Sequence, residues 1–194
     1  MKQNTILLSA IIASIITLAA DFPTLSFTPK TEAELGKQLF FDPILSGDRS
    51  ISCGSCHKPE YGFADNVPFS FGIDSTKTTR NTPTVKNVLA RSRFFWDGRA
   101  NTLEEQALKP IENPDEMNLP ISVAVERLNN DPLYRRAFKK IFGRKPDSLN
   151  LAHAIAAYER TLESTYTAWD RFHNGDTKAM SASAQRGREL FLEK

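Results

Sequence analysis

The stretch Cys53-Gly54-Ser55-Cys56-His57 contains both cysteines and one of the three histidines of this 194-residue chain. A Cys-x-x-Cys-His string is the attachment signature of c-type haem. The two thiols add to the porphyrin vinyl groups, and the adjacent imidazole is a good axial ligand for the iron. The string therefore predicts one covalent haem held by Cys53 and Cys56, with His57 on one face of the iron.

Two other uses of a cysteine pair fit this sequence less well. A thioredoxin-type redox pair belongs to a βαβ unit, and no such alternation surrounds Cys53. A structural zinc site needs a second ligand pair, and the remaining histidines, His153 and His173, are distant and lack ligand spacing. We therefore interpret the pair as haem ligation.

Composition indicates one globular domain with an apolar core. The chain is 40% hydrophobic and 25% charged, which is ordinary for such a domain. Its 25 Lys and Arg nearly balance its 23 Asp and Glu, so the net charge is +2. This balance produces no long-range field that would select nucleic acid. We expect no nucleic-acid partner.

The first twenty residues differ from the rest. Met1-Lys2 supplies a positive start, Ile6–Ala20 is almost uninterruptedly apolar, and small residues close the run. This pattern predicts a signal peptide over residues 1–20, a linker over 21–30 and a periplasmic location. The alternative is an amino-terminal membrane anchor, although the run is shorter than the roughly 20 residues of a bilayer span.

Amphipathic patterns after the signal predict an all-α fold. Apolar residues recur at helical spacing, and two Thr-x-x-Glu strings predict capping boxes, at Thr31 and at Thr102. The predicted helices run from Thr31 to a stop at Pro43 and over 102–107, 121–128, 132–142 and 149–162.

A long segment without helical periodicity separates the first two helices. Residues 42–83 are rich in Gly, Ser and Pro, and a loop of this length is unusual in a compact domain unless it is functional. Haem offers apolar area that Phe63, Phe69 and Phe71 could cover. We therefore expect a cytochrome c-like helical domain wrapped around one covalent haem, with long irregular loops.

The end of the chain repeats an earlier segment. Gly187–Glu193 parallels Gly36–Asp42 position by position in chemical character, and the first copy leads into the haem string. The repeat predicts a haem domain over 31–180 and the first helix of a truncated second cytochrome c domain over 181–194. A chance amphipathic helix is the alternative.

Five segments taken in order resemble the bacterial di-haem cytochrome c peroxidase family, which includes MauG. The segments are Leu35–Pro43, Ile51–His57, Arg80–Thr84, Phe95–Arg99 and Tyr158–Leu162. The resemblance implies an enzyme, a haem peroxidase that reduces hydrogen peroxide to water at this haem. It further implies a second haem beyond Lys194, electrons from a small cytochrome c or cupredoxin, and a homodimer.

The same resemblance places Gln106, Pro110 and Glu116 over the distal face of the haem. A carboxylate there can move a proton between the two oxygens of peroxide, and an amide can hydrogen-bond the peroxide. Without the resemblance, Gln106 and Glu116 would pass for ordinary exposed polar residues.

Two further positions carry implied roles. Trp96 resembles the tryptophan that lies between the two haems on the electron path, although by itself it would be interpreted as a packing anchor. Asn81 matches a position that helps to bind calcium at the domain interface, where amide and carbonyl oxygens suit a hard cation. The other calcium ligands would lie beyond Lys194.

One departure from the family concerns the sixth iron ligand. Many members hold a second His there, supplied by a loop whose counterpart here is 66–80, and this loop has no His and carries Ile73 at about that position. We expect an open sixth position, as in MauG-like members, so the alternative function is a MauG-like oxidase of a protein substrate. A third alternative is a non-catalytic electron-transfer cytochrome whose iron is also ligated by Met117, Met180, His153 or His173.

Overall fold

The computed structural model describes residues 28–193. The predicted signal peptide, 1–20, lies outside the described residues, as does most of the predicted linker, 21–30. No helix within residues 28–193 is long and apolar enough to cross a membrane.

The fold is all-α, as predicted, with isolated β-bridges and no sheet in the described part of the chain. The long connections contain short 3-10 turns, labelled η. The helices are α1 (Glu32–Phe41), α2 (Cys53–Cys56), α3 (Leu103–Glu112), α4 (Ile121–Asn130), α5 (Pro132–Phe142), α6 (Ser148–Arg160), α7 (Ala168–His173) and α8 (Ala182–Leu192).

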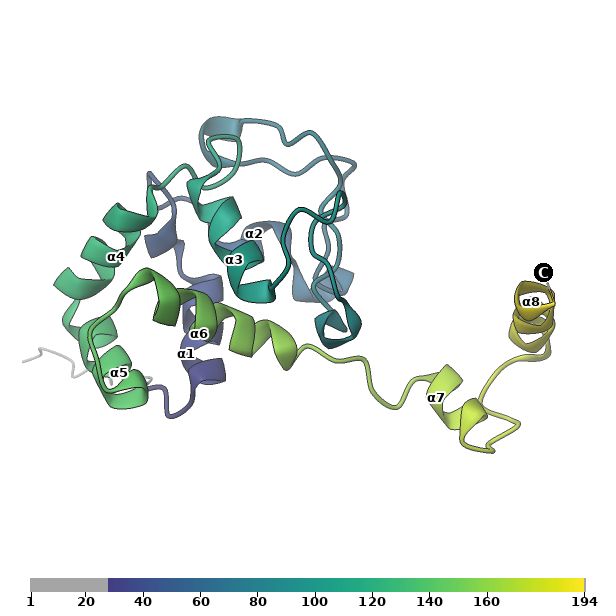
Figure 1. Ribbon diagram of the computed structural model, residues 1–194. Coiled ribbons are helices and arrows are strands. Elements are labelled where there is room, and N and C mark those ends of the chain that lie inside the picture. The colour runs from purple at the N-terminus through teal and green to yellow at the C-terminus, as the bar shows by residue number, and fades with distance from the viewer. Residues whose placement is uncertain (1–27, 194) are drawn as a thin grey trace, which may run out of the picture.

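The core forms where α6 crosses α1, with α3, α4 and α5 packed around the pair (Figure 1). Leu35, Leu39 and Phe40 bury the inner face of α1, and Leu151 and Ile155 bury that of α6. The short helix α2 and the irregular segments gather on one side of this core (Figure 1). The helices therefore form a rigid base that supports the haem string.

One arginine fixes the segment between α1 and the haem string. Arg127 on α4 donates from its guanidinium to the carbonyl oxygens of Ile44, Ser46 and Gly47, at 3.1, 2.6 and 2.8 Å. These three carbonyl oxygens lie in a turn and are not paired within an α-helix or a sheet. The arginine therefore supplies hydrogen bonds that water would otherwise have to supply. The approach to Cys53 is thereby tied to the helical core.

The predicted helix caps are correct, but the predicted capping boxes are incomplete. The Thr31 and Thr102 hydroxyls accept hydrogen bonds from the backbone N–H of Glu34 and Glu105, each at 3.1 Å. The Glu34 and Glu105 carboxylates then accept from the residues before the caps, Lys30 at 2.6 Å and Asn101 at 3.0 Å. Each carboxylate thus satisfies an N–H one position further from the helix than in a capping box.

Three predicted helices have different ends in the structure, and α4 ends at Asn130 instead of residue 128. The helix from Thr102 continues past Ala107 to Glu112 because Pro110 lies in its last turns, where only one helical hydrogen bond is lost. The helix predicted over 149–162 begins at Ser148, where the Asp147 side chain caps it, and ends at Arg160.

Replacing Gly36 with alanine is expected to destabilise the domain strongly. A Cβ at this position would lie 1.8 Å from the carbonyl oxygen of Ala154, so α1 and α6 would have to separate. We expect a loss of about 3 kcal/mol or more of unfolding free energy, measured by denaturant titration. Gly187→Ala is the matched control because nothing lies within 4 Å of its Cβ. Equal stability of the two variants would contradict this account of the α1–α6 contact.

The last two helices stand apart from this core. No residue of α7 or α8 is buried, and both lie beyond the end of α6 (Figure 1). A helix is present where 181–194 was predicted to begin a second domain, and Leu190, Phe191 and Leu192 on it are exposed. The division into domains at residue 180 stays a prediction.

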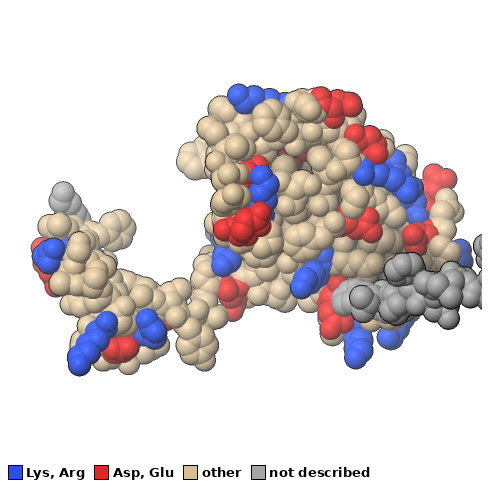
Figure 2. Space-filling model, turned by 180° about the vertical axis from the view of Figure 1, so that it is seen from behind, with Lys and Arg blue, Asp and Glu red and all other residues tan. Residues whose placement is uncertain are grey.

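The charged side chains are mixed on the surface. Figure 2 shows Lys and Arg interspersed with Asp and Glu over the face opposite to that of Figure 1. This mixture agrees with the small net charge of +2.

Candidate functional site

The haem string folds as a single helical turn. Cys53 and Cys56 are the first and last residues of α2, and the Ser55 hydroxyl accepts a hydrogen bond from the Ser52 N–H at 3.0 Å. Spacing of three residues places both thiols on one side of the turn. Both cysteines are free, and burial raises the pKa of Cys53 to about 12 and also raises that of Cys56. They are therefore protonated thiols with no disulfide between them.

His57 directly follows this turn, and one of its ring nitrogens is already used. Its Nδ1 lies 3.1 Å from the carbonyl oxygen of Phe63, which can only accept, so Nδ1 carries the proton and Nε2 keeps its lone pair. Burial lowers the pKa of His57, which favours the neutral ring. A neutral imidazole whose Nδ1 is hydrogen-bonded to a backbone carbonyl is the arrangement of a metal-ligating histidine.

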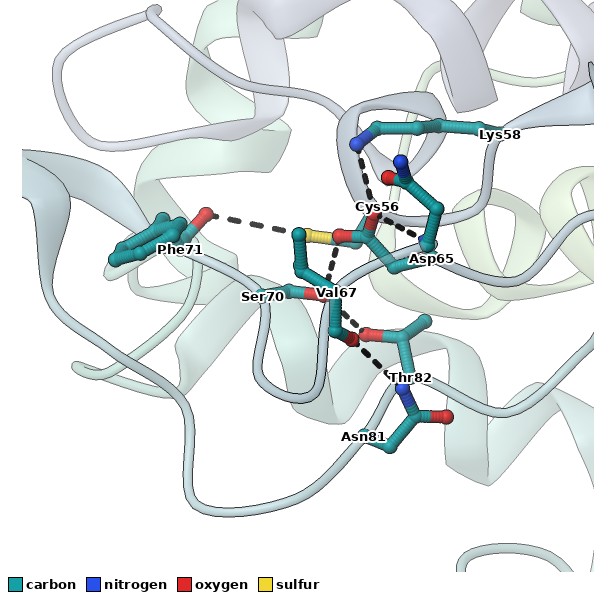
Figure 3. Close-up of polar contacts among 9 residues, drawn as sticks. Cys56, Lys58, Asp65, Val67, Ser70, Phe71, Asn81 and Thr82 are labelled. Carbon is teal, nitrogen blue, oxygen red and sulfur yellow. Dashed lines mark hydrogen bonds and ion pairs between the residues drawn. The ribbon is translucent and has the colours of Figure 1, made fainter. Parts of the chain in front are cut away.

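A polar network holds the loop that follows (Figure 3). Asp65, whose side chain is 4% exposed, accepts from Lys58 Nζ at 2.7 Å and from the Ser70 hydroxyl at 2.6 Å. The Ser70 hydroxyl also lies 2.7 Å from that of Thr82. The network ties residues 58–82 together beside Cys56. No sequence signal marks it, because its members are scattered polar residues of a loop.

The same loop connects Cys56 to the predicted distal residues. The Cys56 thiol lies 3.9 Å from the Phe71 carbonyl oxygen, and the next residues contact the segment containing Glu116. Ile73 N–H donates to the Glu116 carbonyl at 2.9 Å, and a Cβ on Gly72 would lie 2.2 Å from the Asp115 carbonyl oxygen. Glycine at 72 therefore permits the close approach that brings Glu116 to the haem string.

Glu116 is a half-buried carboxyl group near both cysteines. Its charge contributes to the raised pKa of Cys53 and of Cys56. Burial raises the pKa of Glu116 itself, opposed by a hydrogen bond from Asn113 Nδ2 to Oε1 at 2.7 Å and by the positive charge of Arg99. Sequence reasoning missed Asn113, although an Asn-Pro-Asp turn before a glutamate could have indicated an orienting amide.

Gln106 and Pro110 lie one helical turn apart on α3, and Pro110 lies beside the Glu116 segment. The Pro110 carbonyl accepts from Met117 N–H at 3.2 Å, which joins the end of α3 to Glu116. Gln106 is half-buried. The structure thus brings the three predicted distal residues to one region, and their catalytic roles stay predictions.

Trp96 and Asn81 lie on the surface. Trp96 is 87% exposed, so its interpretation as a packing anchor is wrong for this chain. Asn81 is exposed and donates from Nδ2 to the Val67 carbonyl at 2.8 Å. Residues 28–193 contain no group of three or more His, Cys, Asp and Glu that could hold a metal ion. The inter-haem role of Trp96 and the calcium role of Asn81 stay predictions.

The alternative iron ligands have other surroundings. His153 is exposed on α6 and its Nδ1 lies 3.7 Å from Glu104, while the ring of His173 stacks on Trp169. Met117 is buried within the hydrophobic core, and Met180 lies in the turn before α8. Ile73 is buried. The roles of these four residues as a sixth iron ligand stay predictions.

The haem string presents two thiols on one turn followed by a neutral imidazole, and a half-buried carboxyl group lies nearby. These groups fit a covalently attached haem. Fold and site therefore define a c-type haem domain.

Residues 30–178 match the family model described as di-haem cytochrome c peroxidase, and the chain belongs to this family. It is 42% identical to the methylamine utilization protein MauG of Methylorubrum extorquens, over 86% of this chain and 48% of that protein. It is 44% identical to the cytochrome c551 peroxidase of Pseudomonas aeruginosa, over 84% and 48%.

A solved structure has the same fold. The crystal structure of a MauG-like protein associated with microbial copper homeostasis superposes with a TM-score of 0.75 at 30% identity, covering 84% of this chain and 50% of that one. The chain spans about half the length of the curated relatives it matches.

Proposed function

We propose that this chain is the peroxide-reducing haem domain of a periplasmic di-haem enzyme. The reaction is H₂O₂ + 2 e⁻ + 2 H⁺ → 2 H₂O, with electrons from a small cytochrome c or cupredoxin through a second haem beyond Lys194. The observation that carries the proposal is the half-buried Glu116, which the Phe71–Ile73 segment holds near the attachment turn. The relatives called cytochrome c peroxidases support the same assignment.

The attachment residues have separate tasks in this proposal. Cys53 and Cys56 anchor the haem as thioethers, and His57 ligates the iron through Nε2 while Phe63 holds its Nδ1–H. When bound, haem supplies an iron that accepts peroxide and transfers the electrons that break the O–O bond. Its orientation depends on the Asp65 network, which fixes the loop beside Cys56.

Glu116 acts as the general base and general acid of the proposed reaction. Its carboxylate would take a proton from one oxygen of hydrogen peroxide and give it to the other oxygen, which would leave as water. Asn113 holds one carboxylate oxygen at 2.7 Å and leaves the other free for this transfer. The Gln106 amide hydrogen-bonds the peroxide in this proposal. The raised pKa of Glu116 brings its proton affinity closer to neutral pH, where it can act in both directions.

The resting ferric haem of this domain is expected to be high-spin and to react with peroxide without prior reduction, because no His of the 66–80 loop can close the sixth position. The measurement is electron paramagnetic resonance and stopped-flow absorbance of the full-length, haem-loaded protein. A low-spin, six-coordinate haem at this site that ignores peroxide would contradict the peroxidase proposal and favour an electron-transfer cytochrome.

A second candidate is a MauG-like oxidase of a protein substrate. The loop without His and the 42% identity to MauG favour it. Turnover with peroxide and a reduced small cytochrome c separates the two functions. Sustained oxidation of the cytochrome supports the peroxidase, whereas a single rapid reaction with peroxide and no such turnover supports the oxidase.

A further inference from the structure

Helix α6 carries a buried carboxyl group for which the proposed mechanism has no use. Glu159 is 5% exposed, and no hydrogen bond reaches its Oε2 among residues 28–193. Burial raises its pKa to about 8, so the group can gain and lose its proton near neutral pH. Burial of a carboxyl group without a hydrogen-bond partner destabilises the folded protein. Its presence here therefore suggests a function.

Glu159 lies on the side of the domain that holds the haem string. After burial itself, its charge is the strongest cause of the raised pKa of Cys53. The neighbouring Tyr158 packs against Phe40 and Phe41, with ring centroids at 5.2 and 6.1 Å. Phe41 in turn covers Gly54, where a Cβ would lie 2.4 Å from its ring. One layer of aromatic rings therefore connects this end of α6 to α2.

The other charges around Glu159 offset one another. Glu104 on α3 and Arg160 on α6 act on it with opposite signs, and these two form an ion pair of 2.7 Å. The segments packed on this end of α6, α1 and η5 (Val88–Ala90), contribute the apolar side chains of Phe40 and Val88. Cys53 loses its titratable proton once it becomes a thioether. Glu159 is thus a titratable group within electrostatic range of the haem whose own charge is not neutralised by an ion pair.

We propose that Glu159 couples reduction of the haem at Cys53 to uptake of one proton. When the iron gains an electron from the donor protein, the site loses one positive charge, and a nearby carboxylate becomes less favourable. A proton from solvent then forms the O–H bond of the Glu159 carboxyl group, and oxidation of the iron releases it. No other bond changes. The inference rests on haem attachment at Cys53 and not on peroxidase activity.

The test is the midpoint potential of this haem as a function of pH, measured by spectroelectrochemistry on the full-length, haem-loaded protein. Proton uptake on reduction makes the potential fall as pH rises through the pKa of Glu159. Glu159→Gln is expected to remove this part of the slope. The matched control is Glu163→Gln, an exposed glutamate just beyond the same helix, which is expected to keep the slope. An unchanged slope in the Glu159→Gln protein would overturn the proposal.

Infrared spectroscopy provides a second test, which is needed if the Glu159→Gln protein does not fold or does not bind haem. Reduction is expected to produce an infrared C=O band of a newly protonated carboxyl group, present in the wild type and in Glu116→Gln and shifted in Glu159→Asp. If no such band forms, or if Glu159→Asp leaves it unshifted, Glu159 is not the proton site. The reaction with peroxide is followed separately, so failure of the coupling and failure of the proposed peroxidase are distinguishable.

Discussion

Replacing Glu116 with glutamine is expected to slow the reaction of the haem-loaded protein with hydrogen peroxide by about 10²–10⁴-fold, the usual contribution of a positioned general acid and base. Glutamine keeps the shape and can still bond Asn113, but it cannot take up and return a proton. Stopped-flow absorbance of the haem measures the rate. Because the carboxylate form is the base, the wild-type rate rises as pH increases through the pKa of Glu116, which burial has raised. The variant is expected to lack this pH dependence.

The control for this experiment is Glu112→Gln. Glu112 is an exposed carboxyl group at the end of α3, four residues before Glu116, so the two variants share the charge change and differ in the location of the lost group. A normal rate with Glu112→Gln and a slow rate with Glu116→Gln are expected. If Glu116→Gln reacts as fast as the wild type, another group moves the proton.

Replacing both Cys53 and Cys56 with alanine is expected to abolish covalent haem. His57 and its bond to Phe63 would remain, but one axial bond cannot retain haem through denaturation. The measurement is haem staining of the protein after denaturing electrophoresis. Cys53→Ala alone should retain haem through a single thioether, with the absorption band of the pyridine complex shifted.

Ser55→Ala is the control for the cysteine variants. It alters the same turn and removes a hydrogen bond of 3.0 Å, while both thiols and His57 remain. We expect it to stain like the wild type. Covalent haem in the double alanine variant would show that attachment takes place elsewhere.

Local patterns predicted the helices well because helical hydrogen bonds and caps depend on nearby residues. The Thr31 and Thr102 caps and the apolar faces of α1 and α6 are examples. The ends of helices were predicted less accurately. The helix α3 continues through Pro110, although proline removes one backbone hydrogen bond of the helix. The alternative interpretation of Trp96 as a packing anchor was wrong, since exposure depends on what the rest of the fold covers.

The sequence by itself determined that this protein attaches haem, because the chemistry of Cys53, Cys56 and His57 is contained in five consecutive residues. It indicated Glu116 and Gln106 only through family resemblance. Tertiary structure alone decided which segments surround the carboxyl groups: the Glu116 segment contacts Ile73, and the buried Glu159 lies near Cys53. Proton affinity depends on burial and on charges that come from distant parts of the chain. No local pattern encodes those contacts, so the protonation chemistry around the haem string becomes visible only once α3, α6 and the 58–82 loop are packed.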